Sequence, residues 1–157
     1  MINTILSDFS KVILFPKKVN FIGGLNRLHR ELFSSNKDYD FFEYFTLNTE
    51  LLDCYKSLKN KYSINIFTTG EIQNVTQVKE IIKPIFDQII SANEFALSKT
   101  DSKSYVSVTK KLLKRPEEIL YIDDNEKNII AAKKAGLNTF LYKDNKSLIS
   151  FLNSISN

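Results

Sequence analysis

The sequence has a single cysteine, Cys54, and few residues that break regular structure, with 4 glycines and 3 prolines in 157 residues. One cysteine cannot make an internal disulfide, which is typical of a reducing cytoplasm. The scarcity of glycine and proline, with a 43% share of hydrophobic residues, excludes collagen-like, low-complexity and disordered chains. No apolar run approaches the roughly 18 residues of a membrane span, and Met1–Thr4 lacks the basic start of a signal peptide. We therefore expect a cytoplasmic chain with no membrane partner.

Arginine is rare as well. Of the 22 basic residues only three are arginine, at positions 27, 30 and 115, and the formal net charge is +4. Arginine makes most of the bidentate contacts with phosphates and bases, so its scarcity argues against nucleic acid as the partner. The charge thus indicates a slightly basic chain without naming a ligand.

Strand-like and helix-like segments alternate after about residue 50, and the length suits one domain. The expected strands cover residues 5–7, 63–67, 89–90, 119–122 and 139–142. Helices are expected after Asn48, over 72–82, after Asp101 or Ser102, up to Gly136, and after Asn145. This alternation predicts an α/β fold, with a parallel sheet covered by helices on both faces.

The segment between the first strand and Asn48 has a different pattern. Val12–Phe15 and Val19–Ile22, on either side of Pro16-Lys17-Lys18, predict a β-hairpin. Leucines at helical spacing then predict a short helix over residues 25–32, and a polar loop follows at 34–40. The aromatic residues of 39–45 are expected to pack in the core, with an interaction patch as the alternative. The only histidine, at position 29, is expected on the surface.

Polar side chains stand at the ends of the predicted strands. Asp8 follows the first strand, Thr68 the second and Asp123-Asp124 the fourth, while Lys99 lies in the loop after the third. Each has an ordinary structural interpretation, as a turn or cap residue or a solvated lysine. The carboxyl ends of parallel strands meet at one edge of a sheet, where ligands bind. Carboxylates there suit Mg²⁺, and a carboxylate can attack phosphorus, so the sequence predicts a magnesium-assisted phosphoryl site.

Four segments, in order along the chain, resemble the four motifs of the haloacid dehalogenase (HAD) superfamily. They are Ile5–Val12, Ile66–Gly70, Leu97–Tyr105 and, most specifically, Glu117–Leu137, with its apolar strand, acidic pair and helix ending in glycine. The resemblance covers nearly the whole chain. It implies a Rossmann-like, doubly wound sheet whose five strands take the order 5-4-1-2-3, with the hairpin as a flap beside the site.

The resemblance implies a nucleophile and a metal site. Asp8 would be the nucleophile that attacks phosphorus. Mg²⁺ would be held by the carboxylates of Asp8 and Asp124 and the backbone carbonyl of Ser10, with Asp123 beside them.

The resemblance also implies a phosphate site. Thr68 would bind phosphoryl oxygens together with backbone N–H groups of Thr69 and Gly70. Lys99 would pair with Asp8 and neutralise the charge that develops during transfer.

Two features depart from the family pattern. Ser10 stands where phosphatase members have a second aspartate, which protonates the leaving group and later activates water. A serine hydroxyl cannot replace that acid and base, whose loss typically costs about 10²–10⁴-fold in rate. The insertion at about residues 12–46 is also too short for a full helical cap. We therefore expect one HAD-like core domain over residues 1–157, with a vestigial cap and flap.

We expect a Mg²⁺-dependent phosphatase that acts on a phosphorylated small molecule or macromolecule. A degenerate domain that binds phosphate or a protein partner without turnover is the first alternative, and a phosphatase for nucleic-acid ends is the second. A reduced cap indicates an open site, a large substrate, or a homodimer in which another subunit supplies the lid.

Overall fold

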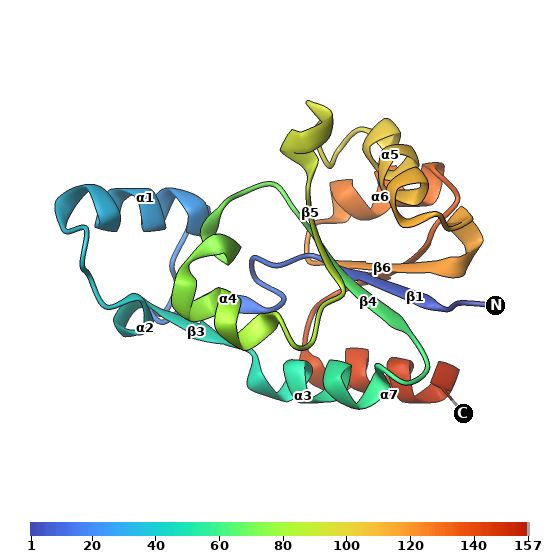
Figure 1. Ribbon diagram of the computed structural model, residues 1–157, viewed down its shortest axis with the longest axis horizontal. Helices are drawn as coiled ribbons and strands as arrows, with labels where there is room; N and C mark the ends of the chain where they lie inside the picture. Colours follow the sequence, from blue (N-terminus) through green and yellow to red (C-terminus); the bar gives the residue numbers. More distant parts are fainter. Residues whose placement is uncertain (157) are drawn as a thin grey trace.

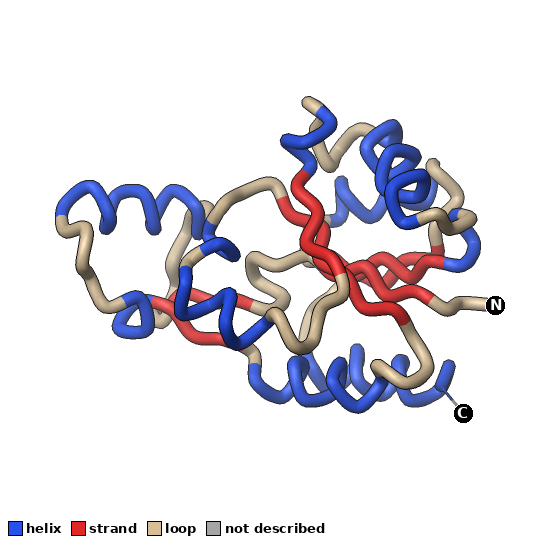
Figure 2. Tube along the Cα trace, in the orientation of Figure 1, coloured by secondary structure: helices blue, strands red, loops and turns tan. Residues whose placement is uncertain are grey.

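A five-stranded parallel sheet forms the centre of the computed structural model, which describes residues 1–156 (Figures 1 and 2). Its strand order is β5-β4-β1-β6-β7, which is the predicted order read from the other edge, so that prediction is confirmed. The bounds are β1 Thr4–Ser7, β4 Ser63–Thr68, β5 Gln88–Ser91, β6 Ile119–Asp123 and β7 Asn138–Leu141. β1 is central because it pairs with both β4 and β6.

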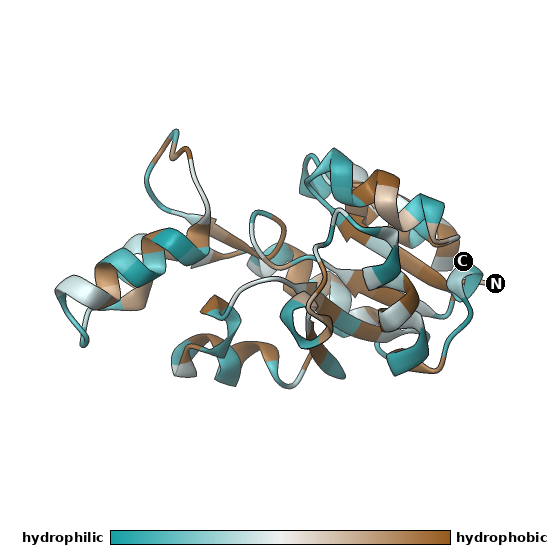
Figure 3. Cartoon of the chain, turned by 90° about the horizontal axis from the view of Figure 1, so that it is seen from above, coloured by the Kyte–Doolittle hydropathy of each residue, from teal (hydrophilic) through white to brown (hydrophobic). Residues whose placement is uncertain are grey.

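Helices cover both faces of the sheet, as Figure 1 shows. Their bounds are α3 Thr49–Leu58, α4 Thr76–Ile82, α5 Ser102–Leu112, α6 Glu126–Lys134 and α7 Asn145–Ser156. Neighbouring residues of a strand point to opposite faces, so Ile5 joins the core under α3, α4 and α7 while Leu6 joins the core under α5 and α6. Apolar strands therefore lie between helices in which hydrophobic and hydrophilic residues alternate (Figure 3).

Helix starts follow the predicted capping residues at two positions. Asn48 and Asp101 each accept a hydrogen bond from a backbone N–H in the first turn of α3 and α5. The cap of α6 is Asn125, which accepts the N–H of Lys127. Such caps satisfy N–H groups that have no partner within the helix. Gly136 follows α6 with a positive φ of 89°, as expected for a residue that ends a helix. None of the helices in residues 1–156 has the length and apolar character needed to cross a membrane.

Two helices begin differently from the prediction. Asp144, rather than Asn145, caps α7, because its carboxylate accepts the N–H of Ser147 at 2.8 Å. The predicted helix over 72–82 is divided into a 3₁₀ turn, η1, at Ile72–Asn74 and α4, because Val75 between them has a non-helical backbone, with φ −55° and ψ 129°. Two further 3₁₀ turns are η2, Ala92–Phe95, and η3, Pro116–Glu118.

The insertion between β1 and α3 contains β2 (Leu14–Pro16), α1 (Leu25–Ser35), α2 (Phe41–Tyr44) and β3 (Phe45–Leu47), and extends away from the sheet (Figure 1). The predicted pairing of 12–15 with 19–22 is wrong: β2 pairs antiparallel with β3. The Lys17 N–H donates to the Tyr44 carbonyl at 2.8 Å, which continues this ladder and leaves no hairpin turn. Residues 19–22 form no strand.

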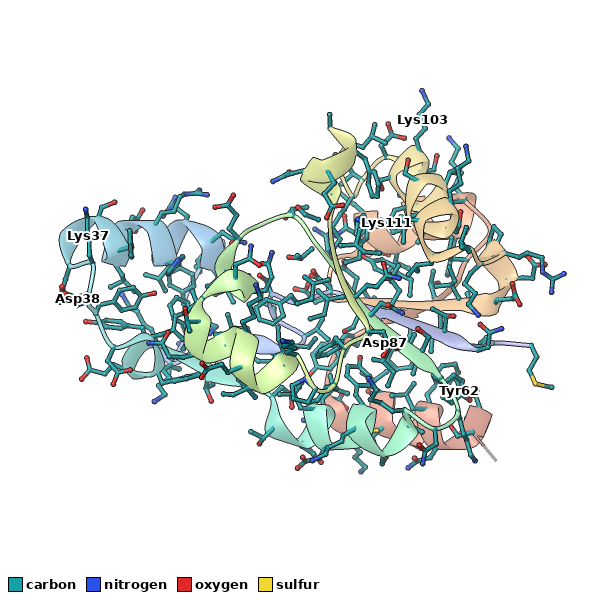
Figure 4. The ribbon with its side chains drawn as sticks, viewed as in Figure 1. Lys37, Asp38, Tyr62, Asp87, Lys103 and Lys111 are labelled. Atoms are coloured by element: carbon teal, nitrogen blue, oxygen red, sulfur yellow. The ribbon has the colours of Figure 1, made fainter. Side chains whose placement is uncertain are left out.

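Aromatic residues hold the insertion together. Phe41 and Phe45 are buried and stacked, with ring centroids 4.6 Å apart, which confirms the expected core packing for these two. His29 is half-buried, instead of lying on the open surface, because its ring hydrogen-bonds to the Tyr39 hydroxyl. Lys37 and Asp38, labelled in Figure 4, mark the outer end of the insertion beyond α1.

Candidate active site at the carboxyl edge of the sheet

The side chains predicted from the strand ends meet at one cavity of about 350 Å³. Asp8 follows β1, Thr68 ends β4 and Asp124 follows β6, so the parallel strands bring them to the same edge. Lys99 enters from the loop before α5, and Ser10 lies just beyond Asp8. All five line the cavity, as does Thr69. The insertion contributes the segment 23–26 to the wall, and the rest of the lining is Lys11, Ser98, Asn125 and Asn128.

A buried ion triad lies at the base of this cavity. The Lys99 Nζ lies 2.7 Å from Asp8 Oδ1 and 2.8 Å from Asp123 Oδ2, and it donates a third hydrogen bond to the Phe67 carbonyl at 3.1 Å. Tyr105 donates to the Lys99 carbonyl at 2.8 Å, which fixes the loop that carries the lysine. All three donors of the ammonium group are therefore engaged.

Asp123 is completely buried and supports its neighbours. Its Oδ1 accepts the N–H of Asn125 at 2.7 Å. Its Oδ2 accepts hydrogen bonds from Tyr121 and from Asn128, in addition to the ammonium of Lys99. Each carboxylate oxygen has about two acceptor positions, so Oδ2 is fully engaged by its three partners, while Oδ1 keeps one position beside the Asn125 N–H. Asp123 positions Lys99 and the start of α6.

The crowded carboxylates have perturbed pKa values. Burial raises the pKa of Asp8 to about 6, with the Asp123 charge adding to this and the Lys99 ammonium opposing it. Burial and the Asp123 charge also raise the pKa of Asp124. Burial alone would lower the pKa of Lys99, but Asp8 and Asp123 outweigh it and raise that pKa. The site thus holds more negative charge than its own lysine neutralises.

Oxygen atoms at this edge suit a hard divalent cation. Asp8, Asp123 and Asp124 each offer a carboxylate oxygen, and these oxygens lie within 4.8 Å of one another. Mg²⁺ usually takes one or two carboxylates with substrate oxygens and water. Asp8 and Asp124 line the cavity whereas the completely buried Asp123 does not, so the first two carboxylates are the ones open to a cation from the cavity. The donor set fits Mg²⁺.

The segment after β4 is shared between the cavity and the insertion. Thr68 is nearly completely buried, and with Thr69 it lines the cavity. Gly70 does not line it and instead lies against the side chain of Asn26, the second residue of α1. The Asn26 Oδ1 accepts the N–H groups of Glu71 and Ile72 at 3.0 and 3.1 Å. The insertion is therefore bonded directly to the segment expected to bind phosphate.

Sequence reasoning did not single out Asn26, Lys11, Asn128 or Tyr121, which also form the site or its support. Asn128 and Tyr121 lie in the segment that resembles the fourth motif. Their short distance from Asp123 along the chain could therefore have indicated that they belong to the site. Lys11 likewise lies in the segment that resembles the first motif, three residues after Asp8. Asn26 has no local signal, because the fold alone brings it to the cavity.

Comparisons with known proteins show the family and the fold of the chain. The family model described as haloacid dehalogenase-like hydrolase matches residues 12–142, a range that includes Thr68, Lys99, Asp123 and Asp124. A HAD family enzyme from Bacteroides thetaiotaomicron, in complex with magnesium and inorganic phosphate, has a TM-score of 0.65 at 16% identity, covering 91% of this chain and 95% of its own. A predicted HAD-like family hydrolase from Porphyromonas gingivalis has a TM-score of 0.70 at 14% identity, covering 100% and 98%. No curated protein matches the sequence.

Proposed function

Because the chain belongs to the haloacid dehalogenase-like hydrolases, we propose that it is a Mg²⁺-dependent phosphatase that acts through an aspartyl-phosphate intermediate on Asp8. The observation that carries this proposal is the Asp8 carboxylate, held 2.7 Å from Lys99 Nζ beside a cavity that Thr68 also lines. A carboxylate, an ammonium group and a hydroxyl around one cavity can bind a phosphoryl group and attack it. The Bacteroides thetaiotaomicron enzyme of similar fold, crystallised with magnesium and phosphate, supports the choice of ligands.

The proposed reaction has two displacements at phosphorus. An Asp8 oxygen forms a bond to phosphorus while the bond to the leaving oxygen breaks, and that oxygen keeps the electron pair. Water then attacks the aspartyl phosphate, which releases inorganic phosphate and restores the Asp8 carboxylate. Lys99 holds Asp8 in place and neutralises charge, and Thr68 and the N–H groups after β4 bind phosphoryl oxygens.

Asp8, Asp124 and the backbone carbonyl of Ser10 would hold Mg²⁺. When bound, the cation supplies positive charge that neutralises the phosphoryl oxygens. Asp123 lies beside them but does not line the cavity, and its Oδ2 is engaged by Lys99 and two other partners.

The residue at position 10 restricts the leaving group. The Ser10 hydroxyl oxygen is buried without a hydrogen-bond partner among residues 1–156, and serine offers no acid near neutrality. Phosphate esters whose leaving groups depart without a proton, such as aryl esters, should therefore react faster than alkyl esters. The same observation favours a second candidate, a domain that binds phosphate without turning it over.

The test is phosphate release from a panel of aryl and alkyl phosphates with Mg²⁺ present. Asp8→Asn keeps the shape of the side chain and removes the nucleophile, so it should abolish release. Asp53→Asn, on the exposed side of α3, is the matched control and should leave release unchanged. Activity that survives Asp8→Asn would refute the mechanism. Phosphate binding without release from any ester would favour the second candidate instead.

A further inference from the structure

Lys11 has a backbone conformation that is unfavourable for its residue type. Its φ is +62°, in the left-handed region, where a residue with a Cβ atom is strained. The conformation closes a tight turn, in which the Lys11 N–H donates to the Leu14 carbonyl at 2.7 Å. Glycine would make this turn without strain. An outlier of this kind beside a functional site is a reason to ask what the side chain does there.

Lys11 lines the same cavity as Asp8, Thr68 and Asp124. It is the second cation of that lining, and within residues 1–156 its ammonium group makes no ion pair. Lys99 is different, because all three of its donors are bonded to protein groups. Lys11 therefore has donors free for an anion in the cavity. Its charge also acts on the Asp124 carboxyl, where it lowers the pKa against the larger effect of burial.

The absence of an acid at Ser10, next to Lys11, suggests a role for the positive charge of Lys11. Ser10 supplies no proton to a leaving oxygen, so negative charge on that oxygen must be balanced in another way. We propose that Lys11 contacts the phosphate ester and that its positive charge stabilises the departing oxygen as the bond to phosphorus breaks. The electron pair stays on that oxygen, and water supplies the proton afterwards. This inference rests on the proposed phosphatase function.

Lys11→Gly distinguishes the effect of the Lys11 side-chain charge from the effect of the backbone conformation of the turn. Glycine relieves the left-handed strain and removes the charge, so the variant should unfold at a higher urea concentration than the wild type. Its affinity for inorganic phosphate, measured by calorimetry on the Mg²⁺-loaded protein, should fall about 10-fold, since a charged hydrogen bond is lost. Its affinity for Mg²⁺ alone should rise, because a positive charge near Asp124 is gone. General damage to the fold would not move these affinities in opposite directions.

Two further variants complete the design. Leu113→Gly relieves the same strain at a left-handed residue (φ +53°) that is 90% exposed and outside the cavity, so it should stabilise the fold and leave phosphate binding unchanged. Lys11→Arg keeps the charge and should keep most of the phosphate affinity. With aryl phosphates of graded leaving-group pKa, the Lys11→Gly rate should depend more steeply on that pKa than the wild-type rate.

Wild-type phosphate affinity and an unchanged leaving-group dependence in Lys11→Gly would overturn the role of Lys11. Failure of the proposed function gives a different result, namely no phosphate release from the wild type. If phosphate binding by such an inactive wild type still weakened 10-fold in Lys11→Gly, the contact of Lys11 with phosphate would stand and its action on a leaving group would fall.

Discussion

Replacing Gly70 by alanine tests how the insertion is held over the active site. A Cβ atom at Gly70 would lie 2.0 Å from the amide group of Asn26, which no side chain tolerates. The backbone of Gly70 lies outside the left-handed region, so alanine itself fits there. The amide of Asn26 must therefore turn away and lose its hydrogen bonds to the N–H groups of Glu71 and Ile72. These are the only side-chain hydrogen bonds between α1 and the sheet domain within residues 1–156.

The cost follows from those two bonds. Each contributes about 0.5–1.5 kcal/mol, so their loss should cost about 1–3 kcal/mol. Replacing glycine by alanine at a compatible position returns about 0.4–1 kcal/mol through the unfolded chain. We therefore expect Gly70→Ala to destabilise the wild type by about 1–2 kcal/mol. In an Asn26→Ala background the clash is absent, and the same substitution should stabilise the protein by about 0.4–1 kcal/mol.

Urea unfolding of the four proteins of this double-mutant cycle, followed by circular dichroism, measures the coupling. Gly24→Ala is the matched control, because its backbone is extended and nothing lies within 4 Å of the added Cβ. That control should be neutral or slightly stabilising in both backgrounds. Costs of Gly70→Ala and Asn26→Ala that simply add, within about 0.5 kcal/mol, would refute the proposed contact between α1 and the segment after β4.

Two other predictions concern the leaving group and acid stability. Ser10→Asp should raise the rate with alkyl phosphates more than with aryl phosphates; equal changes would mean that the missing acid is not what limits the reaction. Asp87, labelled in Figure 4, has an exposed side chain whose limited burial raises its pKa. Hydrogen bonds from Lys59, Ser63 and the N–H of Ile64 outweigh this effect and lower the pKa. A lowered pKa contributes stability above the unfolded value of about 3.9, which is lost as the pH falls through the folded value. Asp87→Asn should therefore cost up to about 1 kcal/mol at pH 7 and less at pH 3 in urea unfolding; an equal cost at both pH values would contradict this.

The sheet could be predicted from the sequence because its signals are local. Apolar runs such as Ile119–Ile122 are buried on both faces and end in acidic residues, and Asn48 and Asp101 cap the helices where a polar side chain precedes an apolar pattern. The pairing of β2 with β3 could not be predicted in this way. Both strands have three residues and lie about 30 positions apart, and nothing near Leu14–Pro16 specifies the partner.

Some residues of the candidate site could likewise be predicted from local signals, and others could not. Asp8, Thr68 and Asp124 could be placed together because strand ends in a parallel sheet share an edge. Asn26 reaches the site only through the packing of α1, and the left-handed backbone of Lys11 has no signature in its residue type. The sequence thus predicts which residues stand at the ends of strands, whereas the contacts made by an insertion can be identified only in the folded structure.

The charges of the site link its two proposed ligands. The carboxylates of Asp8, Asp123 and Asp124 outnumber the ammonium groups of Lys11 and Lys99, so the cavity is net negative before any ligand binds. A phosphate ester carries further negative charge and is repelled by such a site. A divalent cation bound between Asp8 and Asp124 reverses the sign, after which Lys11 and Lys99 add to the attraction. Phosphate should therefore bind the Mg²⁺-loaded protein far more tightly than the metal-free protein, which is why the phosphate titrations of the Lys11 variants need Mg²⁺.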